Sequence, residues 1–121
     1  MARILIVEDE EPLANLYRTL LSRYGHKVVG IVGSGEAAVE IYNRPDPRPD
    51  VVIMDHRLER NSGMDAMKEI LSADPDARVI FASADDSVME EAIENGAADY
   101  IGKPFSMQEL IEVIHRSLAQ P

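Results

Sequence analysis

The chain has no cysteine and no tryptophan, and it carries only four tyrosines and two phenylalanines. Without cysteine there is no disulfide, no thiol catalysis and no zinc–thiolate site. Long apolar runs are missing too, because stretches such as residues 4–7 and 51–54 hold four residues, whereas a membrane-spanning helix needs about 20. No secretory pattern opens the chain, so we expect a cytoplasmic protein without membrane contact.

Basic residues are scarce, with 12 Lys and Arg against 22 Asp and Glu and a formal net charge of −10. A nucleic-acid binder needs clustered basic side chains to displace counterions from phosphates, so we expect no nucleic acid as a partner of this domain. A length of 121 residues suits one domain with its own core. We therefore expect a single domain over residues 1–121, with no output domain after the last predicted helix.

Five short apolar runs rich in β-branched residues predict five buried parallel strands. They cover residues 4–7, 28–32, 51–54, 79–82 and 100–101. Gly30 weakens the second run, which favours an edge position for that strand. Between the second and third units, prolines and charges alternate over residues 44–50, and this pattern predicts a stiff, extended connection inside the domain.

Apolar residues at helical spacing follow each predicted strand and indicate five amphipathic helices. Pro12 suits the first helical position of the first helix, and Gly25 suits the residue beyond its end. Ser34 is the predicted N-cap of the second helix. Ser106 and Glu109 have the spacing of a capping box at the start of the last helix.

Strands that alternate with helices predict an α/β fold, a doubly wound five-stranded parallel sheet with helices on both faces. Ligands of such sheets bind at the carboxyl ends of the strands. Glu8 and Asp9 follow the first strand, and Asp55 follows the third. Ser83 ends the fourth strand and Lys103 follows the fifth. We therefore expect these five side chains to lie together at one rim of the sheet.

Three acids at one rim repel one another, since two unit charges about 5 Å apart cost roughly 3 kcal/mol at an effective dielectric near 20. A bound cation offsets this repulsion, and oxygen ligands without histidine or sulfur suit Mg²⁺ or Mn²⁺. The predicted ligands are Asp9 and Asp55 directly, Glu8 directly or through water, and a backbone carbonyl after Asp55, at Arg57.

A metal-bound phosphate next to these residues would meet a suitable nucleophile and suitable charge stabilisers. The carboxylate of Asp55 is a competent oxygen nucleophile. Lys103 can neutralise phosphoryl oxygens, and Ser83 can donate a hydrogen bond to one of them. Positioning and electrostatics of this kind supply most of what phosphoryl transfer requires.

The same motifs, in the same order, resemble those of the receiver domains of two-component response regulators, with the length and pattern of the chemotaxis members. The resemblance covers residues 2–119. It rests on four segments: Val7-Glu8-Asp9-Glu10, Met54-Asp55 with Gly63, Ala82-Ser83-Ala84, and residues 99–105 with the sequence Asp-Tyr-Ile-Gly-Lys-Pro-Phe. It implies strand order 2-1-3-4-5 and a signalling domain that catalyses only its own phosphorylation and dephosphorylation.

The resemblance also implies a role for each matching residue. These are Asp55 as phosphoacceptor, Glu8 and Asp9 as the metal-binding acids, Ser83 as the switch hydroxyl, Lys103 as the phosphate-binding lysine, and Tyr100 as the aromatic switch residue. The Lys103-Pro104 peptide bond is expected to be cis. The implied partners are a sensor histidine kinase or phosphotransfer protein, and an output partner on the face formed by the fourth helix, fifth strand and fifth helix.

Three positions depart from the family pattern. Glu8 stands where the family usually has aspartate, Glu59 where proline is common, and Ser83 where threonine is common. Two variable positions, Arg57 and Asp85, lie two residues after the acceptor and the switch serine. We hypothesise that these two charges pair across the mouth of the site and slow hydrolysis of the aspartyl phosphate.

Two other protein classes share parts of this pattern. A flavodoxin-like electron carrier has the same fold, but its first loop should be rich in Ser, Thr and Gly, whereas residues 8–11 here are all acidic. A haloacid-dehalogenase-like phosphatase has its nucleophile in an Asp-x-Asp motif on the first strand, where this chain has Glu8-Asp9. His26, His56 and His115 lack ligand spacing, so we predict no metal role for them.

Overall fold

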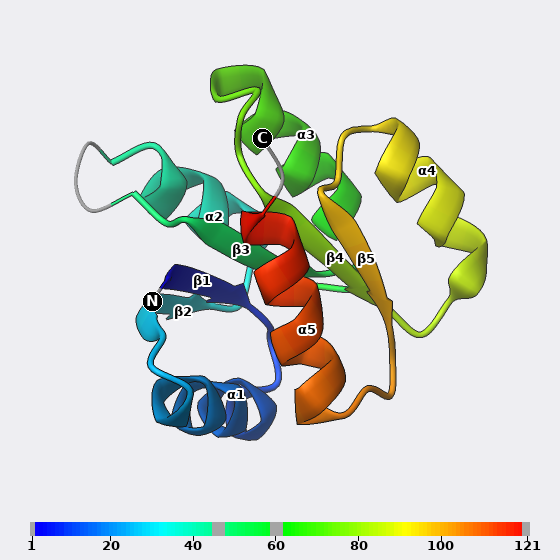
Figure 1. Ribbon diagram of the computed structural model, residues 1–121. Coiled ribbons are helices and arrows are strands. Elements are labelled where there is room, and N and C mark those ends of the chain that lie inside the picture. The colour runs from blue at the N-terminus through cyan, green and yellow to red at the C-terminus, as the bar shows by residue number, and fades with distance from the viewer. Residues whose placement is uncertain (1, 45–47, 59–61, 120–121) are drawn as a thin grey trace.

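The computed structural model describes residues 2–44, 48–58 and 62–119, in which strands and helices alternate (Figure 1). In chain order the elements are β1 (Arg3–Val7), α1 (Glu11–Arg23), β2 (Lys27–Val32), α2 (Gly35–Tyr42), β3 (Val51–Asp55), α3 (Gly63–Ala73), β4 (Val79–Ser83), a short 3₁₀ helix (Asp86–Val88), α4 (Met89–Glu94), β5 (Asp99–Gly102) and α5 (Met107–Leu118). The predicted departure at Glu59 and residues 45–47 of the predicted extended connection lie outside the described residues.

The strands form one sheet in the order β2-β1-β3-β4-β5, and every neighbouring pair is parallel. This confirms the predicted α/β class, the strand order and the edge position of the second strand. Every residue of β3 and β4 is buried, whereas β2 is partly exposed along its length. Up to their last residues, Asp55 and Ser83, these central strands are apolar because helices cover both of their faces.

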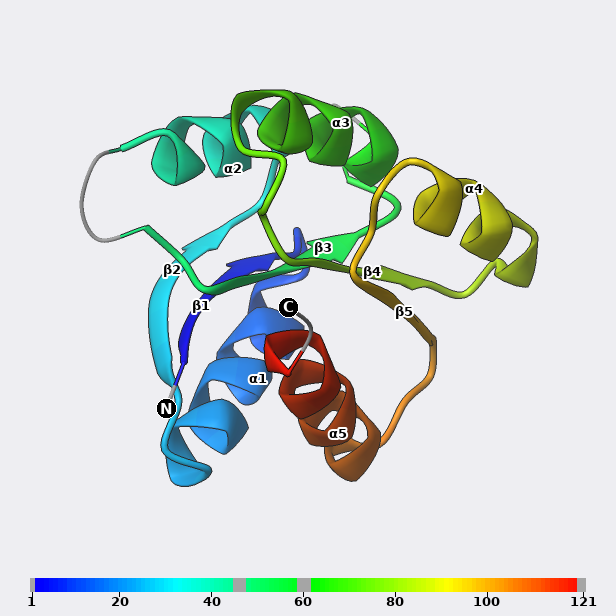
Figure 2. The same ribbon diagram turned by 45° about the horizontal axis from the view of Figure 1, so that its top comes forward.

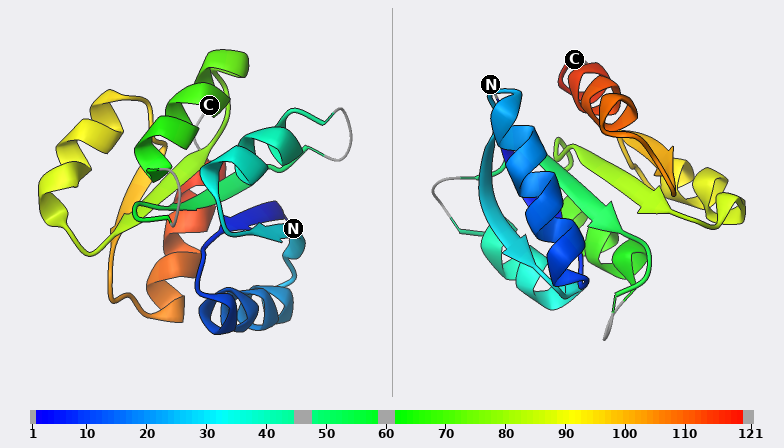
Figure 3. Two further views of the ribbon diagram at one scale, coloured as in Figure 1. Left: turned by 180° about the vertical axis from the view of Figure 1, so that it is seen from behind. Right: turned by 90° about the horizontal axis from the view of Figure 1, so that it is seen from below.

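Successive residues of each strand point to opposite faces of the sheet, and each face has its own core. On one face Ile4, Ile6 and Ile53 pack with Leu21 of α1 and Ile114 of α5. On the other face the alternate strand residues Leu5, Val52, Met54 and Phe81 form a second core with residues of α2, α3 and α4, among them Met67 and Ala92. Figure 2 shows α1 and α5 on one side of the sheet and the other three helices opposite, and Figure 3 shows the same two layers from behind and from below.

The predicted helix ends agree with the structure. Pro12 lies in the first turn of α1, and Gly25 follows that helix with φ of +85°, a conformation that favours glycine. Ser34 Oγ accepts a hydrogen bond from the backbone N–H of Ala37 at the start of α2. Ser106 caps α5 in a complete capping box with Glu109.

Some large apolar residues in and next to the helices are exposed. Leu16 of α1 and Tyr24, directly after that helix, are 51% and 55% exposed, and Met89 and Ile93 of α4 are each 47% exposed. The predicted fourth helix is present as α4, but it is only six residues long and buries only Ala92. Within the described part of the chain, no helix combines the length and apolar character needed to cross a membrane.

Candidate functional site

The register of the sheet brings the polar strand ends to one rim. Val7 pairs with Met54, so Glu8 follows β1 at the level where Asp55 ends β3. Backbone hydrogen bonds extend the pairing past the strands, from the His56 N–H to the Ala82 carbonyl and from the Lys103 N–H to the Ser83 carbonyl. The carboxyl ends of four strands thereby surround a pocket of about 450 Å³. Its lining includes Glu8, Asp9, Asp55, Arg57, Ser83, Asp85 and Lys103.

Three carboxylates meet in this pocket. Glu8, Asp9 and Asp55 can each offer one oxygen, and these oxygens lie within 4.8 Å of one another. Glu8 and Asp55 are buried, with 5% and 8% of their surfaces exposed, whereas Asp9 is exposed. This donor set contains only hard oxygen ligands and keeps one side open to solvent, so it fits a magnesium-like cation.

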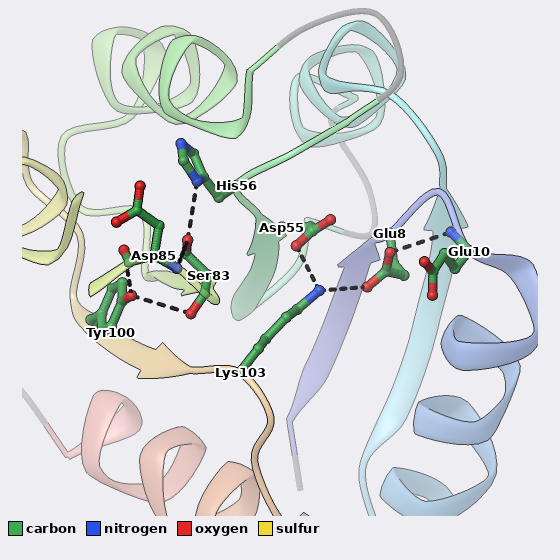
Figure 4. A network of polar contacts seen from close by, with 8 residues as sticks. All are labelled: Glu8, Glu10, Asp55, His56, Ser83, Asp85, Tyr100 and Lys103. Atoms are coloured by element: carbon green, nitrogen blue, oxygen red, sulfur yellow. Dashed lines mark hydrogen bonds and ion pairs between the residues drawn. The ribbon is translucent and has the colours of Figure 1, made fainter. Parts of the chain in front are cut away.

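The ammonium group of Lys103 links the two buried acids (Figure 4). Its Nζ donates to Asp55 Oδ1 at 2.7 Å and to Glu8 Oε1 at 3.1 Å. The second oxygen of Glu8 accepts from the backbone N–H of Glu10 at 3.3 Å. The Lys103 ammonium thus holds the side chains of Glu8 and Asp55 in place, although its one positive charge does not balance the three carboxylates of the cluster.

The burial of these acids disfavours their charged forms. Burial raises the pKa of Asp55 above its ordinary value, and the contacts with Lys103 only partly offset this effect. Burial and the neighbouring Asp55 likewise raise the pKa of Glu8. Burial lowers the pKa of Lys103, but the two carboxylates more than compensate, so its pKa is raised and the side chain stays charged.

Gly63, the first residue of α3, lies against the backbone at the end of β3. The Gly63 N–H donates to the His56 carbonyl, and a Cβ atom at position 63 would overlap the carbonyl oxygen of Asp55. Arg57 and Ser62 form an isolated antiparallel bridge at the same turn. Glycine at this position is therefore a steric requirement for the backbone around Asp55.

A second polar network adjoins the pocket and includes a residue that the sequence did not predict. Ser83 Oγ lies 3.0 Å from Nδ1 of His56 and accepts from the backbone N–H of Asp85 at 2.9 Å. The Tyr100 hydroxyl lies 3.2 Å from the Ser83 carbonyl and 3.1 Å from the Asp85 carbonyl. Figure 4 shows the four residues joined on the side of the pocket away from Glu8. One signal could have pointed to His56, an imidazole directly after the acid that ends β3.

The predicted pairing of Arg57 with Asp85 is not found. Both residues line the pocket, but among the described residues no ion pair joins them. The Asp85 carboxylate instead accepts from the backbone N–H and the hydroxyl of Ser87, at 3.0 and 2.6 Å. These local hydrogen bonds at the start of the 3₁₀ helix are favoured over an ion pair with Arg57, because they restrict fewer side-chain torsions.

Comparison with known proteins identifies the family. A family model described as response regulator receiver domain matches residues 4–115. The chain belongs to this family. The receiver domain is 35% identical to the chemotaxis protein CheY of Thermotoga maritima over 116 residues, which cover 94% of this chain and 95% of the relative.

Further relatives support the same assignment for this receiver domain. The chemotaxis protein CheY of Bacillus subtilis is 37% identical over 118 residues, covering 96% of this chain and 97% of the relative. The crystal structure of a two-component response regulator of the LuxR family from Aurantimonas sp. SI85-9A1 superposes with a TM-score of 0.91 at 30% identity. That match covers 98% of this chain and 86% of the solved one. The receiver domain is therefore a signalling module of two-component systems.

Proposed function

We propose that this receiver domain accepts a phosphoryl group on Asp55 in a reaction that requires Mg²⁺, with a sensor histidine kinase or a phosphotransfer protein as donor. The observation that carries this proposal is the position of Asp55. It ends a central strand, lies in a cluster of three carboxylates whose oxygens are within 4.8 Å, and contacts the Lys103 ammonium at 2.7 Å. The domain would act in the cytoplasm, where such kinases present their phosphohistidine.

The cation would be held by Asp9 and Asp55, by Glu8 directly or through water, and by the backbone carbonyl of Arg57. Glu8 already contacts Lys103, so a water-bridged role is compatible with its present position. When bound, Mg²⁺ supplies positive charge that polarises a phosphoryl group and offsets the repulsion among the acids. Mn²⁺ has the same preference for oxygen ligands and could replace it.

In the transfer itself, a carboxylate oxygen of Asp55 forms a new bond to phosphorus while the bond from phosphorus to the donor nitrogen breaks. The donor imidazole keeps the electron pair of that bond, and Asp55 becomes an acyl phosphate. The Lys103 ammonium already contacts an Asp55 oxygen, and it would donate to an oxygen of the phosphoryl group once that group carries the negative charge. The Ser83 hydroxyl would donate a hydrogen bond to a phosphoryl oxygen.

The switch would run from Ser83 to Tyr100. The Tyr100 hydroxyl contacts the carbonyls of Ser83 and Asp85. A movement of residues 83–85 toward the phosphoryl group would therefore change the hydrogen bonds that hold the Tyr100 ring. Tyr100 belongs to β5, and the exposed Met89 and Ile93 lie on the neighbouring α4. The face of α4, β5 and α5 is therefore the proposed binding site for an output partner.

Incubation with acetyl phosphate, followed by measurement of the intact mass, tests this function. The parent chain should gain one phosphoryl group with Mg²⁺ and none in the presence of a chelator. Asp55→Asn should gain none in either buffer, because the amide is not a nucleophile for this transfer. Asp76→Asn, which changes an exposed acid in the turn before β4, should behave as the parent. Incorporation into Asp55→Asn at the parental rate would refute the proposal.

A further inference from the structure

The hydroxyl of Ser83 is already engaged by His56 in this structure. The distance from Ser83 Oγ to His56 Nδ1 is 3.0 Å, and the Asp85 N–H donates to the same Oγ at 2.9 Å. In Figure 4 the hydroxyl is directed at the imidazole, whereas Asp55 contacts Lys103. Among the described residues, no hydrogen bond joins Ser83 to Asp55.

The proton count of this network creates a competition. A serine hydroxyl carries one proton, and a backbone N–H can only donate, so the proton of Ser83 is available to one acceptor. In the neutral imidazole with its proton on Nε2, Nδ1 of His56 is the acceptor within reach, 3.0 Å from the Ser83 oxygen. A phosphoryl oxygen on Asp55 would need the same proton, because phosphoryl oxygens accept hydrogen bonds and do not donate them. In this tautomer the two contacts exclude each other.

The imidazole is held in place by its surroundings. The backbone N–H of His56 donates to the Ala82 carbonyl at 2.9 Å, which fixes the start of the side chain beside β4. The ring centroid lies 5.6 Å from that of Phe81, a fully buried residue, with the planes inclined by 49°. His56 therefore keeps its nitrogen near Ser83 at little further cost in side-chain entropy.

We propose that His56 is a positioning residue that holds the Ser83 hydroxyl, and with it the loop bonded to Tyr100, in the unphosphorylated arrangement. This inference rests on the proposed phosphorylation of Asp55. Before phosphorylation, Ser83 donates to His56, and the carbonyls of Ser83 and Asp85 hold the Tyr100 hydroxyl. Afterwards, Ser83 donates to the phosphoryl group, and the His56 contact is lost. His56 thereby lowers the fraction of the unphosphorylated domain that is in the active arrangement.

Beryllofluoride, a phosphoryl mimic, provides a quantitative probe in the presence of saturating Mg²⁺. We expect His56→Phe to bind it about fivefold more tightly than the parent, the factor that corresponds to one net hydrogen bond. Phenylalanine can keep the contact with Phe81 but offers no acceptor. In His56→Asn a carbonyl oxygen can take the place of Nδ1, so the affinity should return to within about twofold of the parental value. All titrations are run at the same pH.

The decisive control removes the hydroxyl. In a Ser83→Ala background, His56→Phe should change the affinity by less than about twofold, because there is no proton to compete for. Unliganded His56→Phe should also shift the NMR signals of residues 83–105 part of the way toward the positions of the beryllofluoride-bound parent. A merely structural role of His56 would not produce this shift. Urea unfolding of each variant separates these effects from loss of folding.

Three outcomes would overturn the inference. Unchanged or weaker binding of beryllofluoride by His56→Phe would show that His56 does not compete for the proton. An equal gain in the Ser83→Ala background would assign the effect to the pocket rather than to the hydroxyl. If the parent itself does not bind beryllofluoride with Mg²⁺, the proposed function fails, and this inference falls with it.

Discussion

Replacement of Asp55 by asparagine should stabilise the magnesium-free protein even though it removes a contact with Lys103. At an effective dielectric near 20, two unit charges no more than 4.8 Å apart repel by at least about 3.5 kcal/mol. Asp55 faces two such neighbours, Glu8 and Asp9, so the substitution removes at least about 7 kcal/mol of repulsion. It also removes an attraction of about 6 kcal/mol to Lys103 at 2.7 Å. The balance favours the variant by at least about 1 kcal/mol, and the burial of Asp55 adds to it with the same sign.

Urea unfolding, followed by circular dichroism, measures this difference. With a chelator, Asp55→Asn should unfold at a higher urea concentration than the parent. With Mg²⁺ at a hundredfold excess over its dissociation constant, the parent should gain about 2.7 kcal/mol. The variant has lost one ligand and should gain less, so the order of stabilities should reverse.

The pH dependence gives a second check on the same reasoning. The pKa of Asp55 is raised in the folded state, so the folded chain binds its proton more readily than the unfolded chain. The resulting stability is fully present below the ordinary carboxyl pKa of about 4 and is lost as pH rises through the folded value. The free energy of unfolding of Asp55→Asn should therefore fall less between acidic and neutral pH than that of the parent.

A matched control is Asp50→Asn. The Asp50 carboxylate accepts from the Arg3 N–H at 2.8 Å and pairs with the Arg3 guanidinium at 3.5 Å, with no part in the acidic cluster. This variant should be less stable than the parent in both buffers, and Mg²⁺ should stabilise both chains equally. Lower stability of Asp55→Asn than of the parent in chelator would refute the account of the cluster.

Four further substitutions test other parts of the structure. Lys103→Met should cost about 2 kcal/mol in urea unfolding with chelator, because it leaves two buried acids without their cation; unchanged stability would contradict this. Gly63→Ala should cost about 1–3 kcal/mol and weaken Mg²⁺ binding in calorimetry, because the added methyl group overlaps the Asp55 carbonyl. Burial lowers the pKa of His26, so stability should be full above about pH 6.5 and decline as pH falls, and His26→Asn should lack this decline in unfolding experiments. Arg57→Ala should shorten the lifetime of the phosphorylated state if the exposed guanidinium obstructs water at the pocket, and an equal lifetime at saturating Mg²⁺ would argue against that role.

Much of the fold could be predicted because its causes are local. Runs of β-branched residues marked the strands, and residues such as Pro12, Gly25 and Ser106 marked the helix ends. Parallel strands place all their carboxyl ends at one edge, so the acids at the ends of β1 and β3 could be brought together without coordinates. The cis Lys103-Pro104 bond, implied by the family resemblance, is present as well.

The remaining features depend on tertiary contacts that sequence spacing does not encode. Whether Lys103 points to Glu8, to Asp55 or to both is decided by rotamers in the assembled pocket. The contact of His56 with Ser83 requires the register of β3 and β4. Asp85 was assigned to a distant partner, whereas Ser87, two residues away, offers both a backbone N–H and a hydroxyl. Local competitors of this kind should be considered before a long-range ion pair is predicted.

Chemical trapping of the phosphorylated residue tests the central claim most directly. The chain is incubated with acetyl phosphate and Mg²⁺, reduced with borohydride, which converts an aspartyl phosphate to homoserine, and mapped by peptide mass spectrometry. The account predicts homoserine at position 55, in the presence of Mg²⁺ only. Homoserine at another position, or a stable phosphoryl group on Ser83, would contradict it.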